Sequence, residues 1–399
     1  MNRFLKVYKT RIVLGEKKPV ILRGVNLGGW LMMEGYLLHS PNIPERRFRK
    51  EFAAALGKKA LDDFDRSFRE NFITEKDIGQ IKRLGFNCLR VPFHYRVVEK
   101  APYIYGAKGL SYLDRIVRWA KEYKIWVILD LHAAPGAQNH DWHSDSAGPA
   151  ELWTKKVYRE RTFALWEFLA DRYKDETGVA GYDLLNESVV GGSKPLNGFY
   201  KALIKRIRAV DKNHILFIEG NRWATDIDCL EGFDDDNYAL SVHSYEPAEF
   251  TFNLVPHRIY PYKEKGRACF KAALKEHLSR YAHLSQERRL PIFAGEFGVN
   301  YRGGNYGEGR WLKDMLECFK EFGFHWTYWT YKAVKNSCFP DGLFSYYENP
   351  PWVNRQGPVS GWDTYKSCWK QCRKEMIRSW RTDQFKVNRS ILKVLQDAL

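Results

Sequence analysis

The chain has 399 residues and a mass of 46.9 kDa, with 44% hydrophobic and 28% charged residues. This balance is typical of a globular protein and excludes disordered, collagen-like and coiled-coil chains. No apolar run approaches the roughly 18 residues that span a membrane. No apolar segment follows the basic residues near the start of the sequence, so we expect no secretory signal. We therefore expect a cytoplasmic protein, or an extracellular one if a leader was removed.

The charge balance is basic, with 64 Lys and Arg against 48 Asp and Glu, for a net charge of +16. Such a balance suits nucleic acid, anionic membranes or acidic glycans. The positive residues are spread along expected helices, as at Lys201, Lys205 and Arg208, and no nucleic-acid motif or basic tail is present. We predict a solvated basic surface, with neither a nucleic-acid nor a membrane partner.

The seven cysteines are scattered, odd in number and without a CxxC pair. This pattern predicts no disulfide framework and favours a reducing compartment.

Eight short apolar runs predict β-strands. The runs are nearly continuous rather than alternating, as in strands that are buried on both faces. The expected strands are Val20–Val25, Asn87–Val91, Trp126–Leu131, Ala180–Leu185, Ile215–Glu219, Tyr238–His243, Pro291–Gly295 and Phe324–Tyr328.

Amphipathic stretches between these runs predict helices. Thr74 is a suitable N-cap for a helix whose apolar stripe includes Ile78 and Ile81. Further helices are expected around Leu113, Leu165, Leu203 and Met315. Eight strands alternating with helices predict an α/β chain folded as a (β/α)8 barrel. A doubly wound open sheet is the alternative, but residues 24–30 lack the glycine spacing of a phosphate-binding turn.

We predict one domain over residues 1–399. Residues 1–19 form an N-terminal segment, and residues 364–399 form two helices that close the barrel. The stretch 336–363 is long, rich in Pro, Gly and aromatic residues, and follows the last strand. It predicts an extended functional loop rather than a domain junction.

Polar or aromatic residues follow most of the predicted strands. In a (β/α)8 barrel, chemistry is located at the carboxyl ends of the strands. One such residue alone is more often a cap or a structural group, but their convergence on one rim indicates a site. These residues are Asn26, Glu34, Arg90, His132, Asn186, Glu187, His243, Tyr245, Glu296 and Trp329.

Two of these residues, Glu187 and Glu296, follow the fourth and seventh strands and could face each other across the barrel. Two carboxyl groups that flank a bond, one protonated and one ionised, are the groups that hydrolyse glycosides. Arg90 and Tyr245 are candidates to hold Glu296 ionised as the nucleophile. Glu187 would then be the acid, which needs a less polar setting or a nearby negative charge.

Three neighbours are expected to assist this pair. His243 would adjust the proton affinity of Glu187. Trp329 would form a floor for the apolar face of a sugar, and Asn186 and His132 would hold ring hydroxyls.

The sequence resembles glycoside hydrolase family 5, a family of retaining (β/α)8 enzymes, over residues 23–363. The resemblance is carried by the segments 23–30, 85–92, 130–132, 185–187, 243–245, 295–298 and 326–329. It implies eight family residues, namely Arg90, His132, Asn186, Glu187, His243, Tyr245, Glu296 and Trp329. It also implies that Glu187 is the acid/base and Glu296 the nucleophile, without a metal or cofactor.

Residues 26–34 and 132–139 look like the exo-β-1,3-glucanase branch, which implies that Glu34 binds the terminal glucose. Asn139 and Asp145 are candidate substrate residues by the same resemblance, although Ser146 stands where that branch has a sugar-binding Asn. Residues 243–247 and 296–299 look more like bacterial cellulases. The stretch 140–143 could suit a metal, but we interpret it as a substrate loop with Trp142 as a stacking wall.

We therefore predict a retaining β-glycosidase that hydrolyses β-glucosidic bonds of oligosaccharides or β-glucans. The alternatives are a β-mannosidase or mannanase, an endoglucanase, a glycolipid-headgroup glycosidase, or a sugar-binding barrel without catalysis.

Overall fold

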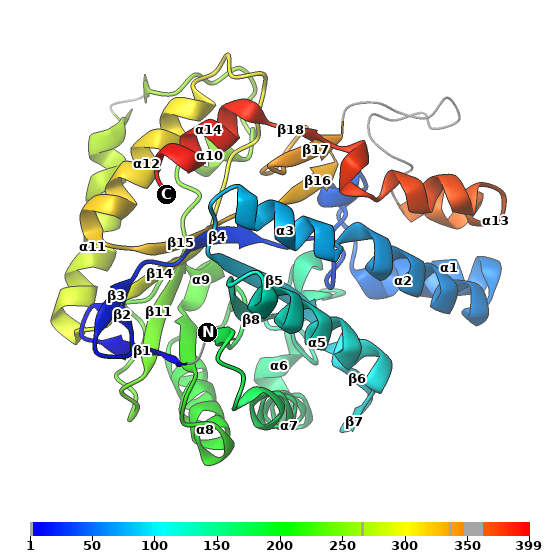
Figure 1. Cartoon of the computed structure of the whole chain (residues 1–399), viewed down its shortest axis with the longest axis horizontal. Coiled ribbons are helices and arrows are strands. Elements are labelled where there is room, and N and C mark those ends of the chain that lie inside the picture. Colours follow the sequence, from blue (N-terminus) through cyan, green and yellow to red (C-terminus); the bar gives the residue numbers. More distant parts are fainter. Residues whose placement is uncertain (1–2, 265–266, 335–336, 347–361) are drawn as a thin grey trace.

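The computed structural model describes residues 3–264, 267–334, 337–346 and 362–399. Eight parallel strands form a closed barrel in the order β4, β5, β8, β9, β10, β11, β14 and β15 (Figure 1). Their bounds are Arg23–Asn26 (β4), Cys88–His94 (β5), Trp126–Ala133 (β8), Val179–Asp183 (β9), Ile215–Glu219 (β10), Tyr238–His243 (β11), Ile292–Phe297 (β14) and His325–Tyr328 (β15). The eight predicted strands are confirmed, with ends shifted by a few residues.

Closure of the barrel excludes the open-sheet alternative. The last strand, β15, pairs in parallel with the first, β4, with Trp326 opposite Arg23. Every residue of β5 is buried, because its inner face meets the barrel interior and its outer face meets helices. This double burial explains why the strands read as continuous apolar runs.

Helices surround the barrel. The longer ones are α1 (Glu45–Leu56), α2 (Lys58–Phe72), α3 (Glu75–Arg83), α5 (Ala107–Glu122), α7 (Lys156–Tyr173), α8 (Lys194–Val210), α11 (Lys271–Arg288), α12 (Glu308–Phe322), α13 (Trp362–Ser379) and α14 (Arg389–Asp397). The short ones are α4 (Tyr95–Val98), α6 (Glu151–Thr154), α9 (Asn221–Ala224) and α10 (Ala248–Thr251). Thr74 and Asp77 form a capping box at the start of α3, which confirms the expected N-cap.

The N-terminal segment folds as a three-stranded antiparallel sheet of β1 (Leu5–Tyr8), β2 (Arg11–Leu14) and β3 (Lys18–Val20). Leu5 and Ile12 are buried in one cluster with barrel residues such as Ile128, Phe217 and Phe293. The sheet therefore covers the end of the barrel opposite the strand ends that carry the polar residues, and it extends the hydrophobic core there.

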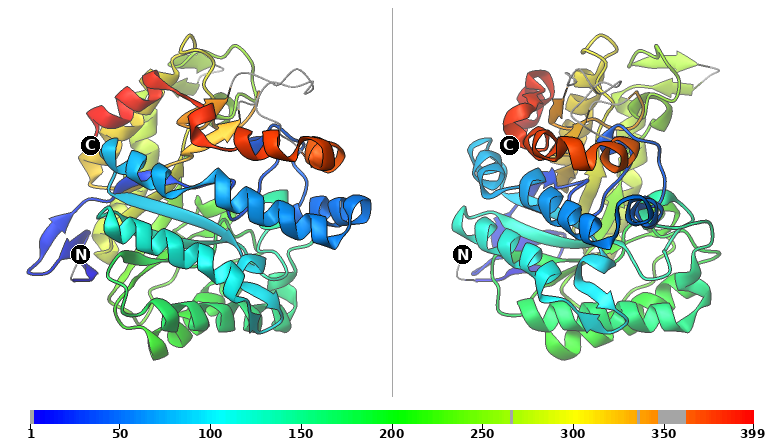
Figure 2. Two further views of the ribbon diagram at one scale, coloured as in Figure 1. Left: turned by 45° about the vertical axis from the view of Figure 1, so that its right-hand side comes forward. Right: turned by 90° about the vertical axis from the view of Figure 1, so that its right-hand side faces the viewer.

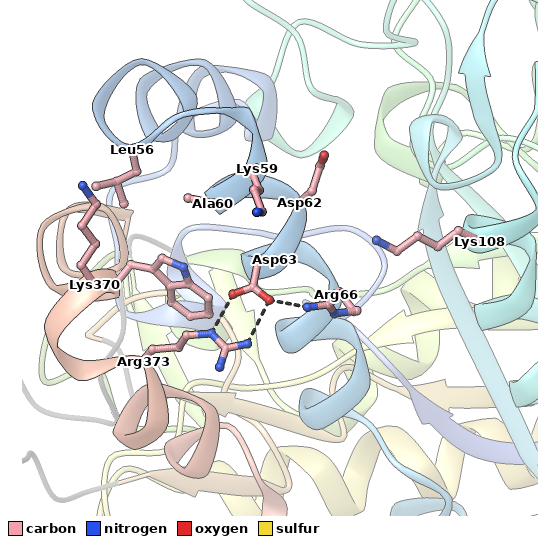
Figure 3. Close-up of a pocket in the computed structure, with 10 residues that line it drawn as sticks. Leu56, Lys59, Ala60, Asp62, Asp63, Arg66, Lys108, Lys370 and Arg373 are labelled. Atoms are coloured by element: carbon pink, nitrogen blue, oxygen red, sulfur yellow. Dashed lines mark hydrogen bonds and ion pairs between the residues drawn. The ribbon is translucent and has the colours of Figure 1, made fainter.

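The two C-terminal helices pack against different parts of the protein. We expected both to close the barrel; α14 packs against α12, whereas α13 packs against α1 and α2. Figures 1 and 2 show α1, α2 and α13 side by side as a helical arm beside the barrel. Aromatic rings form the core of this arm. The ring centroids of Phe64 in α2 and Trp369 in α13, for example, lie 5.3 Å apart. On its surface (Figure 3), Arg373 pairs with both oxygens of Asp63 at 2.7 and 2.9 Å.

In the part of the chain that the structure describes, three smaller sheets lie in the segments between the barrel strands and helices. They are β6 (Glu99–Ala101) with β7 (Ile104–Tyr105), β12 (Tyr262–Glu264) with β13 (Arg267–Cys269), and β16 (Lys332–Val334) with β17 (Phe344–Tyr346) and β18 (Lys386–Val387). Most of the predicted functional loop at 336–363 lies outside the described residues. The described helices include none with the length and apolar character needed to cross a membrane. Six cysteines whose side chains are described are free.

Candidate active site

Arg90 is the centre of a buried cluster of carboxylates at the carboxyl ends of the strands. Its guanidinium, which has no exposed surface, lies 2.7 Å from Glu296, 2.8 Å from Asp183, 3.0 Å from Glu219 and 3.2 Å from Asp130. Burial opposes its charge, but the carboxylates outweigh burial and raise the pKa of Arg90 well above its usual value. Arg90 is thus a permanent cation beneath the site.

Glu296, at the end of β14, receives two donors. Arg90 Nη1 donates to Oε1 at 2.7 Å, and the hydroxyl of Tyr245 donates to Oε2 at 2.8 Å. Burial and the charge of Glu296 raise the pKa of Tyr245 well above its usual value, so its hydroxyl remains a donor. A guanidinium and a phenol on opposite oxygens stabilise an ionised carboxylate. The sequence analysis expected these two neighbours of Glu296.

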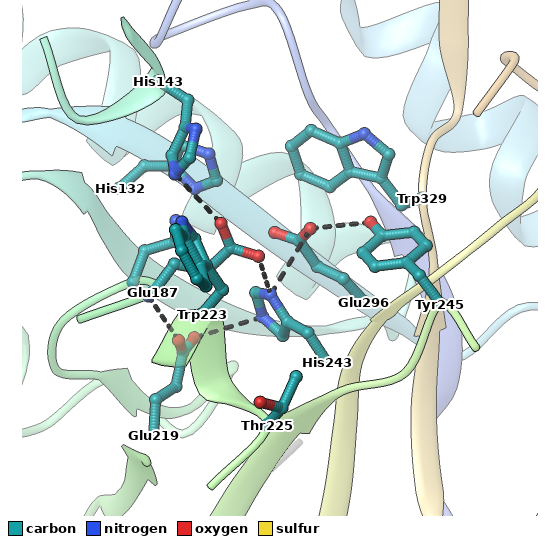
Figure 4. Close-up of polar contacts among 12 residues, drawn as sticks. His132, His143, Glu187, Glu219, Trp223, Thr225, His243, Tyr245, Glu296 and Trp329 are labelled. Carbon is teal, nitrogen blue, oxygen red and sulfur yellow. Dashed lines mark hydrogen bonds and ion pairs between the residues drawn. The ribbon is translucent and has the colours of Figure 1, made fainter. Parts of the chain in front are cut away.

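Glu187, just beyond β9, adopts a left-handed backbone with φ of 48°. Such a conformation is costly for a residue other than glycine and is typical of functional sites. Its backbone N–H donates to Glu219 Oε2 at 2.6 Å. The side chain points toward Glu296 (Figure 4): carboxyl oxygens of the two glutamates and a ring nitrogen of His243 lie within 4.8 Å of one another.

Two histidines contact the carboxyl group of Glu187. His243 Nδ1 lies 2.7 Å from Oε1, and His143 Nε2 lies 3.0 Å from Oε2. Burial raises the pKa of Glu187, but these two contacts outweigh burial and leave the pKa below its usual range. The sequence analysis expected a less polar setting or a nearby negative charge for this residue, whereas the two histidine contacts favour its ionised form.

His132 links two further carboxyl groups. Its Nδ1 lies 2.8 Å from Asp130 Oδ2, and its Nε2 lies 3.6 Å from Glu34 Oε1. Burial lowers the pKa of His132, but Asp130 and Glu34 outweigh it and raise the pKa to about 10. Burial raises the pKa of Glu34, and its Oε1 has no hydrogen-bond partner among the described residues. A buried acceptor of this kind suits a hydroxyl group of a ligand.

An aromatic wall borders these groups. The ring of Trp329 stacks on His132, with centroids 5.5 Å apart and planes 7° from parallel. The indole N–H of Trp329 donates to the hydroxyl of Tyr36. Trp142 packs edge-on against Tyr36 at 5.7 Å. The two predicted sugar-stacking tryptophans therefore belong to one wall.

Three further predicted site residues differ in their hydrogen-bond partners: Asn186, Asn139 and Asp145. Asn186 accepts from Arg90 at 2.8 Å, and its Nδ2 has no partner among the described residues. Asn139 is buried and donates to the backbone carbonyl of Glu187 at 2.8 Å. Asp145 lies 3.0 Å from His94, and its other oxygen accepts from the backbone of Arg46 at 2.7 Å. Asp145 thus anchors its loop, whereas Asn186 Nδ2 is a donor that no described residue engages.

Among the residues that the structure describes, two clusters have the donor types of a metal site. One consists of Glu187, His243 and Glu296, and the other of Asp130, Asp183 and Glu219. Arg90 contacts all three carboxylates of the second cluster and Glu296 of the first. The guanidinium therefore already supplies a positive charge to both clusters.

The structure adds residues that the sequence analysis did not select. Asp183 and Glu219 end predicted or observed strands, so the strand-end rule could have included them. The sequence analysis included His143 only as part of the 140–143 loop and gave it no role of its own. Trp223 follows β10 in a run of three left-handed residues, with φ of 52°, 54° and 60° at positions 222, 223 and 224. It is 39% exposed.

Several contacts place Trp223 beside Glu187. Its indole N–H donates to Asp141 at 2.7 Å, and its backbone N–H donates to the carbonyl of Ser188 at 3.3 Å. Ser188 directly follows Glu187. Figure 4 draws the indole in the same group of side chains.

Comparisons with known proteins identify the family of this chain. The family model described as cellulase (glycosyl hydrolase family 5) matches residues 54–335. A β-xylosidase of Phanerodontia chrysosporium is 34% identical, over 83% of this chain and 71% of that protein. A probable glucan 1,3-β-glucosidase A of Emericella nidulans is 30% identical, over 83% of this chain and 89% of that protein.

More distant matches include bacterial enzymes. Endoglucanase C of Acetivibrio thermocellus is 27% identical, over 78% of this chain and 91% of that protein. A crystal structure of an endoglucanase from Thermotoga maritima superposes with a TM-score of 0.61, covering 90% of this chain and 96% of that one at 19% identity. This likeness supports the barrel fold. The chain belongs to glycosyl hydrolase family 5 and is a glycoside hydrolase that acts on β-glycosides.

Proposed function

We propose that this chain is a retaining β-glycosidase that removes single β-glucosyl units from oligosaccharides or β-glucans. The observation that carries the proposal is the pair of carboxyl groups, with oxygens of Glu187 and Glu296 within 4.8 Å. Retaining enzymes place their carboxyl groups about 5–5.5 Å apart, and inverting enzymes place them farther apart to admit a water.

The contacts of each glutamate support a division of roles. Glu296, held by Arg90 and Tyr245, attacks the anomeric carbon and forms a covalent glycosyl-enzyme. Glu187 gives its proton to the departing oxygen as that bond breaks. It then takes a proton from the water that cleaves the glycosyl-enzyme, which returns both carboxyl groups to their starting states.

Exo action is supported by the enclosure of the sugar-binding side. Glu34, Tyr36, His132 and Trp329 are each at most 6% exposed, so these residues lie deep in the site rather than on an open surface. Glu34 Oε1 and Asn186 Nδ2, which lack partners among the described residues, are placed to bind hydroxyls of the terminal sugar. The exposed Trp223 then lies on the side of the leaving group, next to Glu187.

A β-xylosidase is the second candidate, because the Phanerodontia chrysosporium relative with 34% identity bears that name. The site contacts described above do not depend on the exocyclic CH2OH that distinguishes glucose from xylose. The choice between the two sugars therefore needs a substrate test.

The test is product analysis on laminari-, cello- and manno-oligosaccharides and on the 4-nitrophenyl β-glucoside and β-xyloside. Release of glucose one unit at a time, with a β-anomer as the first product seen by NMR, supports the proposal. A first-formed α-anomer contradicts retention. Mixed longer products indicate an endoglucanase, mannose a mannosidase, and faster xyloside cleavage the second candidate. A location in the cytoplasm stays a prediction.

A further inference from the structure

Glu219, at the end of β10, is a fully buried carboxylate with no part in the roles proposed for Glu187 and Glu296. Its two oxygens face different partners (Figure 4). Oε2 accepts the backbone N–H of Glu187 at 2.6 Å. Oε1 lies 3.0 Å from Nη2 of Arg90 and 3.3 Å from Nε2 of His243. Glu219 therefore contacts both the backbone of Glu187 and the histidine that faces its carboxyl group.

The backbone contact stabilises a conformation that is costly for Glu187. Its φ of 48° is left-handed, and a residue other than glycine keeps such a conformation only where its surroundings enforce it. A hydrogen bond from an N–H to a carboxylate is shorter and stronger than one between neutral groups, and this one is buried. The bond to Glu219 therefore helps to enforce the left-handed backbone, which sets the direction in which the Glu187 side chain leaves the chain.

Further hydrogen bonds join the segments that follow the two strands. The side chain of Asn221 accepts from the backbone N–H of Val190 at 3.0 Å and donates to its carbonyl at 2.9 Å. The backbone N–H of Trp223 donates to the carbonyl of Ser188 at 3.3 Å. Together with the contact of Glu219, these bonds fasten the segment 187–190 to the end of β10.

His243 connects Glu219 to the carboxyl group of Glu187. Its Nδ1 lies 2.7 Å from Glu187 Oε1, while its Nε2 faces Glu219 and is offered no other hydrogen bond by the described residues. Burial lowers the pKa of His243, but Glu296 and Glu219 outweigh burial and raise it well above its usual value. Both ring nitrogens therefore carry a hydrogen, and the ring is held between two carboxyl groups.

We propose that Glu219 and Asn221 are positioning residues that aim the carboxyl group of Glu187 at the departing oxygen, through the backbone of Glu187 and through His243. The inference deepens the proposed function and rests on Glu187 being the acid/base. Glu219 has no exposed surface, and its oxygens are engaged by Glu187, Arg90 and His243. It therefore acts through Glu187 rather than on the substrate.

The dependence of activity on the leaving group tests the proposal. The test compares kcat/KM for the methyl and 2,4-dinitrophenyl β-glycosides of the sugar that the wild type prefers. Glu219→Gln keeps the size of the side chain, but its NH2 cannot accept from the donors that the second oxygen serves. A misplaced acid should lower kcat/KM for the methyl glycoside by about 100-fold. The dinitrophenyl glycoside should lose much less, because its leaving group needs little protonation. Equal losses overturn the proposal.

Asp183→Asn is the matched control. Asp183 is also fully buried and lies 2.8 Å from Nε of Arg90. Among the described residues it makes no hydrogen bond or ion pair with Glu187 or His243. Its substitution should therefore lower kcat/KM equally for the two glycosides. A loss that favours the methyl glycoside as strongly as in Glu219→Gln would assign the effect to Arg90 and overturn the proposal.

Two further measurements apply even if Glu219→Gln does not fold. Asn221→Asp keeps the acceptor for Val190 N–H but removes the donor to its carbonyl, and it should show the same preferential loss on the methyl glycoside; equal losses overturn the proposal. In wild-type enzyme labelled with 15N-glutamate, the amide proton of Glu187 should resonate far downfield, as a short bond to a carboxylate requires. An amide proton at an ordinary position contradicts that bond.

A failure of the proposed function looks different. If Glu187 is the acid/base, Glu187→Ala loses far more kcat/KM on the methyl than on the dinitrophenyl glycoside. Equal losses in Glu187→Ala would contradict the proposed function itself. If Glu187→Ala shows the difference and Glu219→Gln does not, only the positioning role of Glu219 is wrong.

Discussion

The guanidinium of Arg90 and the carboxylate of Glu296 form a buried ion pair, with Nη1 2.7 Å from Oε1. Both side chains are almost fully buried, at 0% and 6% exposure. Three more carboxylates contact the same guanidinium. Arg90 therefore contributes both to the chemistry of the site and to the stability of the barrel.

Arg90→Met should therefore destabilise the fold as well as abolish activity. Loss of one partner leaves charged groups buried without compensation, which costs about 3–5 kcal/mol. Urea denaturation measures this loss. Arg172→Met is the control, because Arg172 pairs with Asp114 at 2.7 Å on the surface and is 41% exposed; it should cost at most about 1 kcal/mol. Equal losses in the two variants would contradict the central role of Arg90.

Glu187→Gln and Glu296→Gln should each remove turnover without unfolding the chain. The loss of general acid catalysis at Glu187 lowers kcat/KM by roughly 10²–10⁴-fold, less for substrates with good leaving groups, which need little protonation. Glu296→Gln should be impaired on all substrates, because no glycosyl-enzyme forms. Glu176→Gln, which changes a surface partner of Lys121, is the control. Normal kinetics in either site variant would remove that residue from the mechanism.

Trp223→Ala should weaken binding on the side of the leaving group. The exposed indole is held by Asp141 beside Glu187, so its loss should raise KM for oligosaccharides by about 2–10-fold, equivalent to about 0.5–1.5 kcal/mol. Methyl β-glucoside, whose leaving group is too small to reach a platform, should be unaffected. Tyr103→Ala, at a residue that is 50% exposed in another loop, is the control. The same KM change for both substrates would argue against a leaving-group contact.

The charge of His132 should make its contribution to stability depend on pH. The folded pKa is raised to about 10, above the unfolded value of about 6.5. Its contribution is therefore complete below about pH 6.5 and is lost as pH rises through 10. His132→Gln should cost more stability at pH 6 than at pH 10 in urea titrations. The same substitution at exposed His140 is the control, and a cost at His132 that does not change with pH would contradict the assignment.

Much of the fold could be predicted from local patterns. A strand that is buried on both faces requires apolar residues at nearly every position, so runs such as 215–219 and 238–243 were identified with their observed bounds. The cap of α3 at Thr74 is also a local feature. The partners of α13 depend on contacts with α1 and α2, which precede it by most of the chain, and no local pattern encodes them.

The candidate site also contains some residues that the sequence predicted and others whose contacts only the structure showed. Arg90, Glu187, His243 and Glu296 were predictable because a barrel brings the carboxyl ends of its strands to one rim. Asp145 has the right residue type, but in the structure its carboxylate binds His94 and Arg46. His143 was read as part of a substrate loop, yet it contacts Glu187 directly.

Residue order and hydrophobic pattern were enough to establish the barrel, its family and its two glutamates, because burial and strand position are recorded locally along the chain. The surroundings of Glu187 could be described only from the folded structure. Its carboxyl group contacts His143, from the loop after β8, and His243, at the end of β11. A sequence lists such groups, whereas folding decides which of them face each other at hydrogen-bonding distance.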